Sequence, residues 1–151
     1  MTNSSRPPAR GIRAATLVAI LLVLAQSAVG VIVNLYVAVP DHHPGAHPSS
    51  YLSGSFRSVV WAVAHGAPSL AIHAVLGLAL ILVALRVVLR SWRLRRPAIT
   101  ALATLAALLV IGAGFNGASF LDFDENASSL IMALLALASV GCYAAVLAVA
   151  S

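Results

Sequence analysis

The chain contains no lysine, a single cysteine (Cys142) and only four acidic residues. Charged residues make up 9 % of its 151 residues and hydrophobic residues 61 %, whereas soluble domains carry about 25 % charged residues. This apolar composition excludes a disordered chain, and one cysteine excludes a disulfide scaffold. Enzyme motifs are missing as well: paired intramembrane carboxylates, H-E-x-x-H, a glycine-rich phosphate loop and G-x-S-x-G. We therefore expect a membrane protein that is not an enzyme.

The charge that is present is strongly basic, with nine arginines and a formal net charge of +5. Nucleic-acid-binding proteins are also basic, but they gather their charge on a soluble polar face. Here the arginines lie between long apolar runs, where membrane topology accounts for them better. The expected partner is thus the lipid bilayer, and nucleic acid is not expected.

Four apolar segments are long enough to cross a bilayer as helices, which takes about 20 residues each. They cover residues 14–39, 68–90, 98–120 and 127–150. None alternates with the period of two that a membrane barrel strand requires, and a helix satisfies its own backbone in lipid. The sequence predicts an all-α fold, a four-helix transmembrane bundle formed by one domain at 14–151 after a cytoplasmic tail at 1–13.

The first apolar run has features of a signal peptide, because arginines precede it and the small residues Ala25 and Ser27 suit a cleavage site. The run continues well past both residues, to about twice the length of the apolar region in a typical signal peptide. We therefore expect an uncleaved span.

The arginines also orient the predicted bundle. Those that flank one side are Arg6, Arg10, Arg13, Arg86, Arg90, Arg93, Arg95 and Arg96. The other side receives Arg57 and the four acids, Asp41, Asp122, Asp124 and Glu125. Because arginine is enriched in cytoplasmic segments, both termini are expected inside the cell.

The segment 40–67 is the sizeable part expected outside the membrane, as an outer loop. Its first half, DHHPGAHPSSYLSGS, is rich in proline, glycine and serine, which predicts an irregular structure. Its second half, FRSVVWAVAH, places apolar residues at helical spacing. This pattern predicts a short interfacial helix before the second span, with Trp61 at the level of the headgroups.

Histidines gather in the first half of this loop. His42, His43 and His47 follow Asp41, and imidazole and carboxylate groups are ligands that Zn²⁺ or Cu²⁺ accepts. The spacing is irregular and is interrupted by two prolines. Two interpretations stay open: a metal site on the outer face, or a solvated loop rich in histidine.

Three polar side chains fall at one depth within the predicted spans, each about one turn below the outer end of its helix: Asn34, His73 and Asn116. At about 1.5 Å per residue, they lie roughly 6–8 Å below the interface. Polar residues in lipid are costly and mark functional sites, but they also hydrogen-bond between helices and hold bundles together. The sequence predicts that these three side chains meet in a polar layer.

His73 and Gly77 form an H-x-x-x-G motif, and Gln26 and Gly30 lie in the first span. The motif is similar to haem-ligating helices of four-helix membrane b-type cytochromes, and the Gln26–Gly30 pattern resembles that of small four-span bacterial membrane proteins. The resemblance implies haem b ligated by His73, with Gly77 giving the porphyrin space. The other spans contain no histidine. Either a second iron ligand comes from the outer loop, where His65 is a candidate together with His42, His43 and His47, or the iron has one protein ligand.

These observations leave three functions open. The leading one is a non-enzymatic structural or accessory subunit that contacts another membrane protein or a second copy of the chain. The alternative is a b-type haem protein in electron transfer that uses His73. The third is metal binding by the histidines of the outer loop.

Overall fold

The structure, a computed structural model, describes residues 7–123 and 126–150. Within these residues, five helices follow one another: α1 (Pro7–Tyr36), α2 (Tyr51–His65), α3 (Pro68–Leu94), α4 (Pro97–Phe123) and α5 (Asn126–Val149). By length and composition, α1, α3, α4 and α5 can each cross a membrane. The predicted all-α class and its four apolar spans are confirmed.

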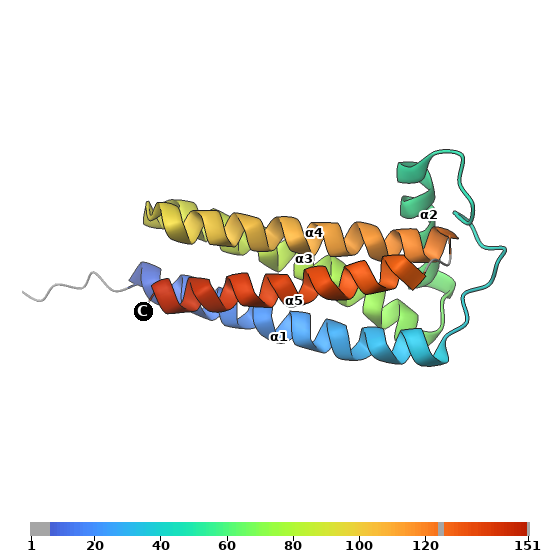
Figure 1. Cartoon of the computed structure of the whole chain (residues 1–151), viewed down its shortest axis with the longest axis horizontal. Coiled ribbons are helices and arrows are strands. Elements are labelled where there is room, and N and C mark those ends of the chain that lie inside the picture. The colour runs from blue at the N-terminus through green and yellow to red at the C-terminus, as the bar shows by residue number, and fades with distance from the viewer. Residues whose placement is uncertain (1–6, 124–125, 151) are drawn as a thin grey trace, which may run out of the picture.

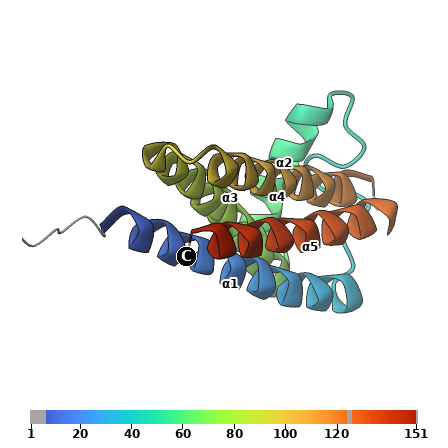
Figure 2. The same ribbon diagram turned by 60° about the vertical axis from the view of Figure 1, so that its left-hand side comes forward.

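The four long helices lie side by side in an up-and-down bundle (Figure 1). α1 packs against α3 and α5, and α4 packs against the same two helices, so the bundle closes on itself. A view turned by 60° shows the same arrangement (Figure 2). Pro68 and Pro97 begin α3 and α4, because proline at the first position of a helix gives up no intrahelical hydrogen bond.

Small side chains bring the helices together. Alanines with at most 7 % of their surface exposed line the contacts along the bundle: Ala15, Ala19, Ala84, Ala103, Ala106, Ala107 and Ala150. Small residues allow close packing of helices in lipid, where burial of apolar surface gives little net gain. The outward surface is apolar instead, with side chains such as Leu21, Leu82 and Leu137 more than half exposed. Lipid is the solvent that this surface fits.

The shortest helix, α2, lies transverse to the long helices at one end of the bundle, called here the α2 end (Figure 1). It packs on α3 and α4 with a buried face that contains Ser55, Ser58 and Ala62. The sequence predicted a helix within FRSVVWAVAH, but the helix begins at Tyr51, inside the part expected to be irregular. This first turn contacts α4 through the Tyr51 hydroxyl, which donates a hydrogen bond to the carbonyl oxygen of Phe115.

The ends of the spans differ from those expected. α1 stops at Tyr36, three residues before Val39, and Pro40 disfavours a helical conformation at Val39 itself. α1 also begins at Pro7, so residues 7–13 of the expected tail are helical; residues 1–6 lie outside the described part. α3 continues past residue 90 and ends where Arg95 adopts a left-handed conformation with φ 52°.

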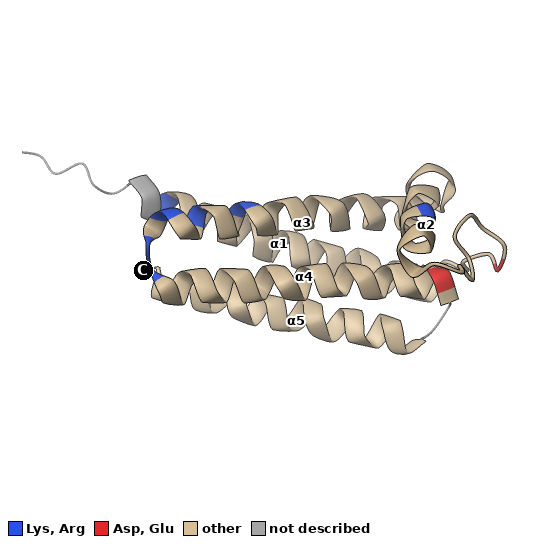
Figure 3. Cartoon of the chain, turned by 90° about the horizontal axis from the view of Figure 1, so that it is seen from above, with Lys and Arg blue, Asp and Glu red and all other residues tan. Residues whose placement is uncertain are grey.

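Charge is segregated along the bundle (Figure 3). The end opposite α2, called here the arginine end, carries Arg10, Arg13, Arg86, Arg90, Arg93, Arg95 and Arg96. Arg57, Asp41 and Asp122 lie at the α2 end. The described charges therefore separate as the sequence predicted; Arg6, Asp124 and Glu125 lie outside the described residues.

Candidate functional site

Within the bundle, a side-chain hydrogen bond joins α1 to α3. Gln26 Nε2 lies 3.1 Å from His73 Nε2. The amide nitrogen is a donor only, so in this contact Gln26 donates and the imidazole nitrogen accepts. His73 Nδ1 and Gln26 Oε1 are buried without a partner among the described residues. The pair therefore crosslinks two spans while leaving two polar atoms unpaired in an apolar interior.

A glycine on the opposite helix accommodates each member of this pair. A β-carbon on Gly30 would lie 2.9 Å from Cε1 of His73, and one on Gly77 would lie 3.1 Å from Nε2 of Gln26. The contacts are reciprocal, because α1 contributes Gly30 and Gln26 while α3 contributes His73 and Gly77. The space that the haem interpretation gives to a porphyrin is filled by the His73 ring and the Gln26 amide. The residues around His73 thus fit each other and, as packed, do not fit a haem.

The other two residues of the predicted polar layer have partners elsewhere. Asn34 accepts a hydrogen bond from Ser129 Oγ of α5 at 3.1 Å, at an exposed position. Asn116 Nδ2 donates to the carbonyl oxygen of Gly112 in its own helix at 2.9 Å. No hydrogen bond joins Asn34, His73 and Asn116 to one another in the part of the chain that the structure describes. Position along a helix sets depth, but rotation about its axis decides which side chains meet.

A second polar cluster lies at the α2 end, around Asp122 near the end of α4. Its side chain is 1 % exposed. The carboxylate accepts hydrogen bonds from Ser55 Oγ at 3.0 Å and from Ser58 Oγ at 2.5 Å. The carbonyl oxygen of Asp122 accepts the N–H of His47 at 3.0 Å. One residue thereby attaches both α2 and the preceding connection to α4.

His43 attaches the same connection by a second route. Its Nε2 donates to the carbonyl oxygen of Leu121 at 2.9 Å, and its ring stacks on Trp61 with centroids 4.5 Å apart. The last carbonyls of a helix have no partner within the helix, so these donors complete the end of α4. Tyr51 adds a third contact, because its hydroxyl donates to the carbonyl oxygen of Phe115 and lies 2.7 Å from Ser119 Oγ.

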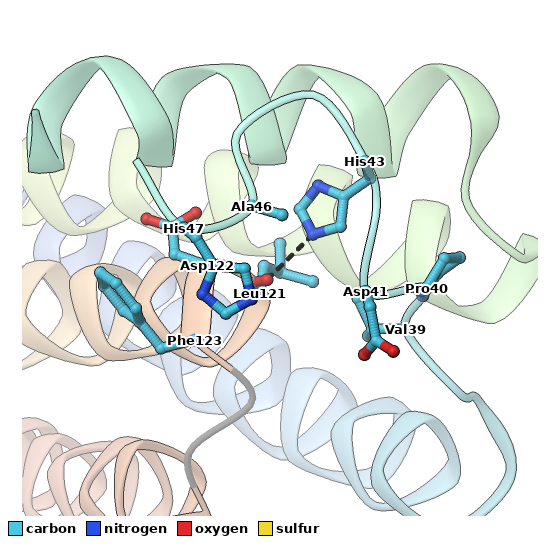
Figure 4. A pocket seen from close by; sticks show the side chains of 9 residues that line it. All are labelled: Val39, Pro40, Asp41, His43, Ala46, His47, Leu121, Asp122 and Phe123. Atoms are coloured by element: carbon cyan, nitrogen blue, oxygen red, sulfur yellow. Dashed lines mark hydrogen bonds between the residues drawn. The ribbon is translucent and has the colours of Figure 1, made fainter. Parts of the chain in front are cut away.

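A pocket of about 280 Å³ opens beside this cluster (Figure 4). Its walls are formed by Val39, Pro40, Asp41, His43, Ala46, His47, Leu121, Asp122 and Phe123. His43 points its ring nitrogen at the Leu121 carbonyl, while His47 lies beside Phe123. The predicted metal ligands are thus divided: His43 is buried and hydrogen-bonded, while His42 and His47 are exposed. Across the described ranges, His, Cys, Asp and Glu side chains form no group of three or more that would hold a metal ion.

His65, the other candidate iron ligand, is exposed in the last turn of α2. The residues that sequence reasoning did not single out are Asp122, Ser55 and Ser58 as a unit. The charge pattern counts Asp122 only among the four acids on the side opposite the arginine-rich one. The buried face of α2 could have been identified in part from the sequence, since Ser55, Ser58 and Ala62 recur at helical spacing.

No family profile, curated protein or solved structure matches the chain.

Proposed function

We propose that the chain is a non-enzymatic structural or accessory subunit of the bacterial cytoplasmic membrane, which contacts another membrane protein or a second copy of itself. The observation that carries the proposal is the use of its polar side chains. Gln26 with His73, Asn34 with Ser129, and Asp122 with the serines of α2 all join one helix to another. Such bonds stabilise a bundle in lipid and leave few polar groups for chemistry.

In this proposal the arginine end faces the cytoplasm and α2 lies at the opposite membrane surface. The segregation of arginines supports the orientation, because arginine is enriched on the cytoplasmic side. Apolar side chains exposed at helical spacing on α2 support its interfacial position: Leu52, Phe56, Val60 and Val63. These apolar side chains lie on a different face of α2 from the serines that bind Asp122. One face of α2 therefore packs on the bundle, and the other is available to the membrane surface.

The test is purification of the full chain in mild detergent from haem-replete cells, followed by an absorbance spectrum and native mass measurement. The proposal expects no Soret band and either a stoichiometric membrane partner or a homo-oligomer. A colourless monomer without a partner would contradict the accessory role. A Soret band that disappears in His73→Gln and persists in His42→Gln would replace the proposal with the haem function.

A further inference from the structure

One face of α3 at the arginine end combines cations with exposed apolar side chains. Arg86 and Arg93 lie seven residues apart. Leu89 lies between them, three residues after Arg86 and four before Arg93. Leu82 lies four residues before Arg86. Residues at these separations share one face of a helix. Leu82 is 69 % exposed and Leu89 53 %, and both arginines are exposed too. We call these four residues the α3 stripe.

The arginines of the α3 stripe have no counter-ion in the described part of the chain. The described acids, Asp41 and Asp122, lie at the other end of the bundle (Figure 3). The neighbouring Arg90 donates to the carbonyl oxygen of Gly11 at 2.6 Å, so its position is defined by α1. Two cations are thus displayed on an apolar face without an anion from residues 7–123 or 126–150.

The depth of Arg86 limits what that anion is. α3 has 27 residues and is therefore about 40 Å long, against roughly 30 Å for the hydrocarbon core of a bilayer. Arg86 lies about two turns, or roughly 12 Å, before the end of α3. In a bilayer its backbone would then lie below the headgroups, at a depth from which a side chain of this length can reach up to them. At that level the available acceptors are lipid phosphates.

We propose that the α3 stripe binds an anionic phospholipid. Arg86 and Arg93 donate hydrogen bonds to its phosphate, while an acyl chain lies over Leu82 and Leu89. The leucines favour a lipid over a soluble acidic protein or a free phosphate, because neither of these covers apolar surface within the bilayer. The unbalanced positive charge favours an anionic headgroup over a zwitterionic one, by about 1 kcal/mol per arginine near the surface. This inference depends on the membrane spans and is independent of the accessory role.

The test is native mass spectrometry of the full chain from vesicles that contain equal amounts of phosphatidylglycerol and phosphatidylcholine. We expect preferential retention of phosphatidylglycerol, reduced about fivefold by Arg86→Gln or by Arg93→Gln. The matched control is Arg57→Gln at the α2 end, which we expect to leave retention unchanged. Arg86→Lys should give an intermediate loss, because lysine keeps the charge without the two-pronged donor geometry.

Equal retention of the two lipids by the unaltered chain would overturn the proposal. So would an equal loss in the Arg57→Gln control, since the effect would then come from overall charge. Displacement of phosphatidylglycerol by millimolar inorganic phosphate would show an anion site without lipid character. If retention appears only when a copurifying protein is removed, the stripe is a protein-binding surface. Should the glutamine variants fail to fold, two measurements still decide the outcome. They are the retention of phosphatidylglycerol by Arg86→Lys and the loss of phosphatidylglycerol from the unaltered chain as salt is added.

Discussion

The imidazole of His73 lies directly against the backbone of Gly30, where a β-carbon would come within 2.9 Å of the ring carbon Cε1. The ring is also held from the side by Gln26, at 3.1 Å. It therefore has little freedom to move away from an added methyl group. This contact makes the α1–α3 packing sensitive to the smallest possible side-chain change.

Gly30→Ala is expected to destabilise the bundle by about 1–3 kcal/mol, the usual range for overpacking a well-packed core. The measurement is the free energy of unfolding in detergent micelles. Gly141→Ala is the matched control, because a β-carbon there meets nothing within 4 Å. Both changes bring the same gain in helix propensity, so the difference between them isolates the contact with His73. Equal stabilities of the two variants would refute the close packing.

The Gln26–His73 bond predicts a measurable coupling between α1 and α3. A double-mutant cycle with Gln26→Leu and His73→Leu should give a coupling energy of about 0.6–2 kcal/mol, as for other interhelical hydrogen bonds in membranes. A second cycle with Asn116→Leu and His73→Leu is the control. Its coupling should be near zero, because Asn116 bonds to its own helix. A larger coupling in the second cycle would restore the predicted polar layer.

Ser58→Ala should loosen α2 from the bundle. It removes one of the two hydroxyl donors to the Asp122 carboxylate, and hydrogen bonds to charged groups contribute about 1.5–3 kcal/mol. Hydrogen exchange of the α2 amides should speed up accordingly. Ser53→Ala serves as the control, since Ser53 is exposed and bonds to the carbonyl oxygen of Ser50 in the same turn. Unchanged exchange in Ser58→Ala would mean that Asp122 does not retain α2.

His43→Leu should free the connection before α2, because it removes the bond to Leu121. The His47 N–H, which bonds to the Asp122 carbonyl oxygen, should then exchange faster with solvent. His42→Leu is the neighbouring control at an exposed position. If the two variants behave alike, the histidines of this segment have equivalent, solvated roles.

The distribution of arginines predicts the topology. A reporter fused after Ser151 should read as cytoplasmic, and one inserted near Ser50 as periplasmic. A reporter inserted near Ser50 of an Arg57→Gln variant should also read as periplasmic, because the arginines of the arginine end dominate the orientation. Reversed readings from both positions would rule out the proposed orientation.

Much of the candidate site was predictable as a set of residues but not as a set of contacts. Gln26, Gly30, His73 and Gly77 all stand out as polar or small residues in apolar spans. Their spacing fits a porphyrin as well as it fits reciprocal packing. Only the pairing of α1 with α3 puts Gly30 opposite His73 and Gly77 opposite Gln26. Spacing within one helix cannot decide between a ligand and a neighbouring helix.

The sequence by itself determined the number of apolar spans, their approximate limits and the segregation of charge. These depend on composition along short stretches, because a span needs only length and hydrophobicity. The tertiary structure decided which polar groups meet. Asp122 and Ser58 are far apart in the sequence, and their contact depends on α2 folding back across the end of α4. Such contacts follow from the rotation and crossing of whole helices, which no local pattern of residues encodes.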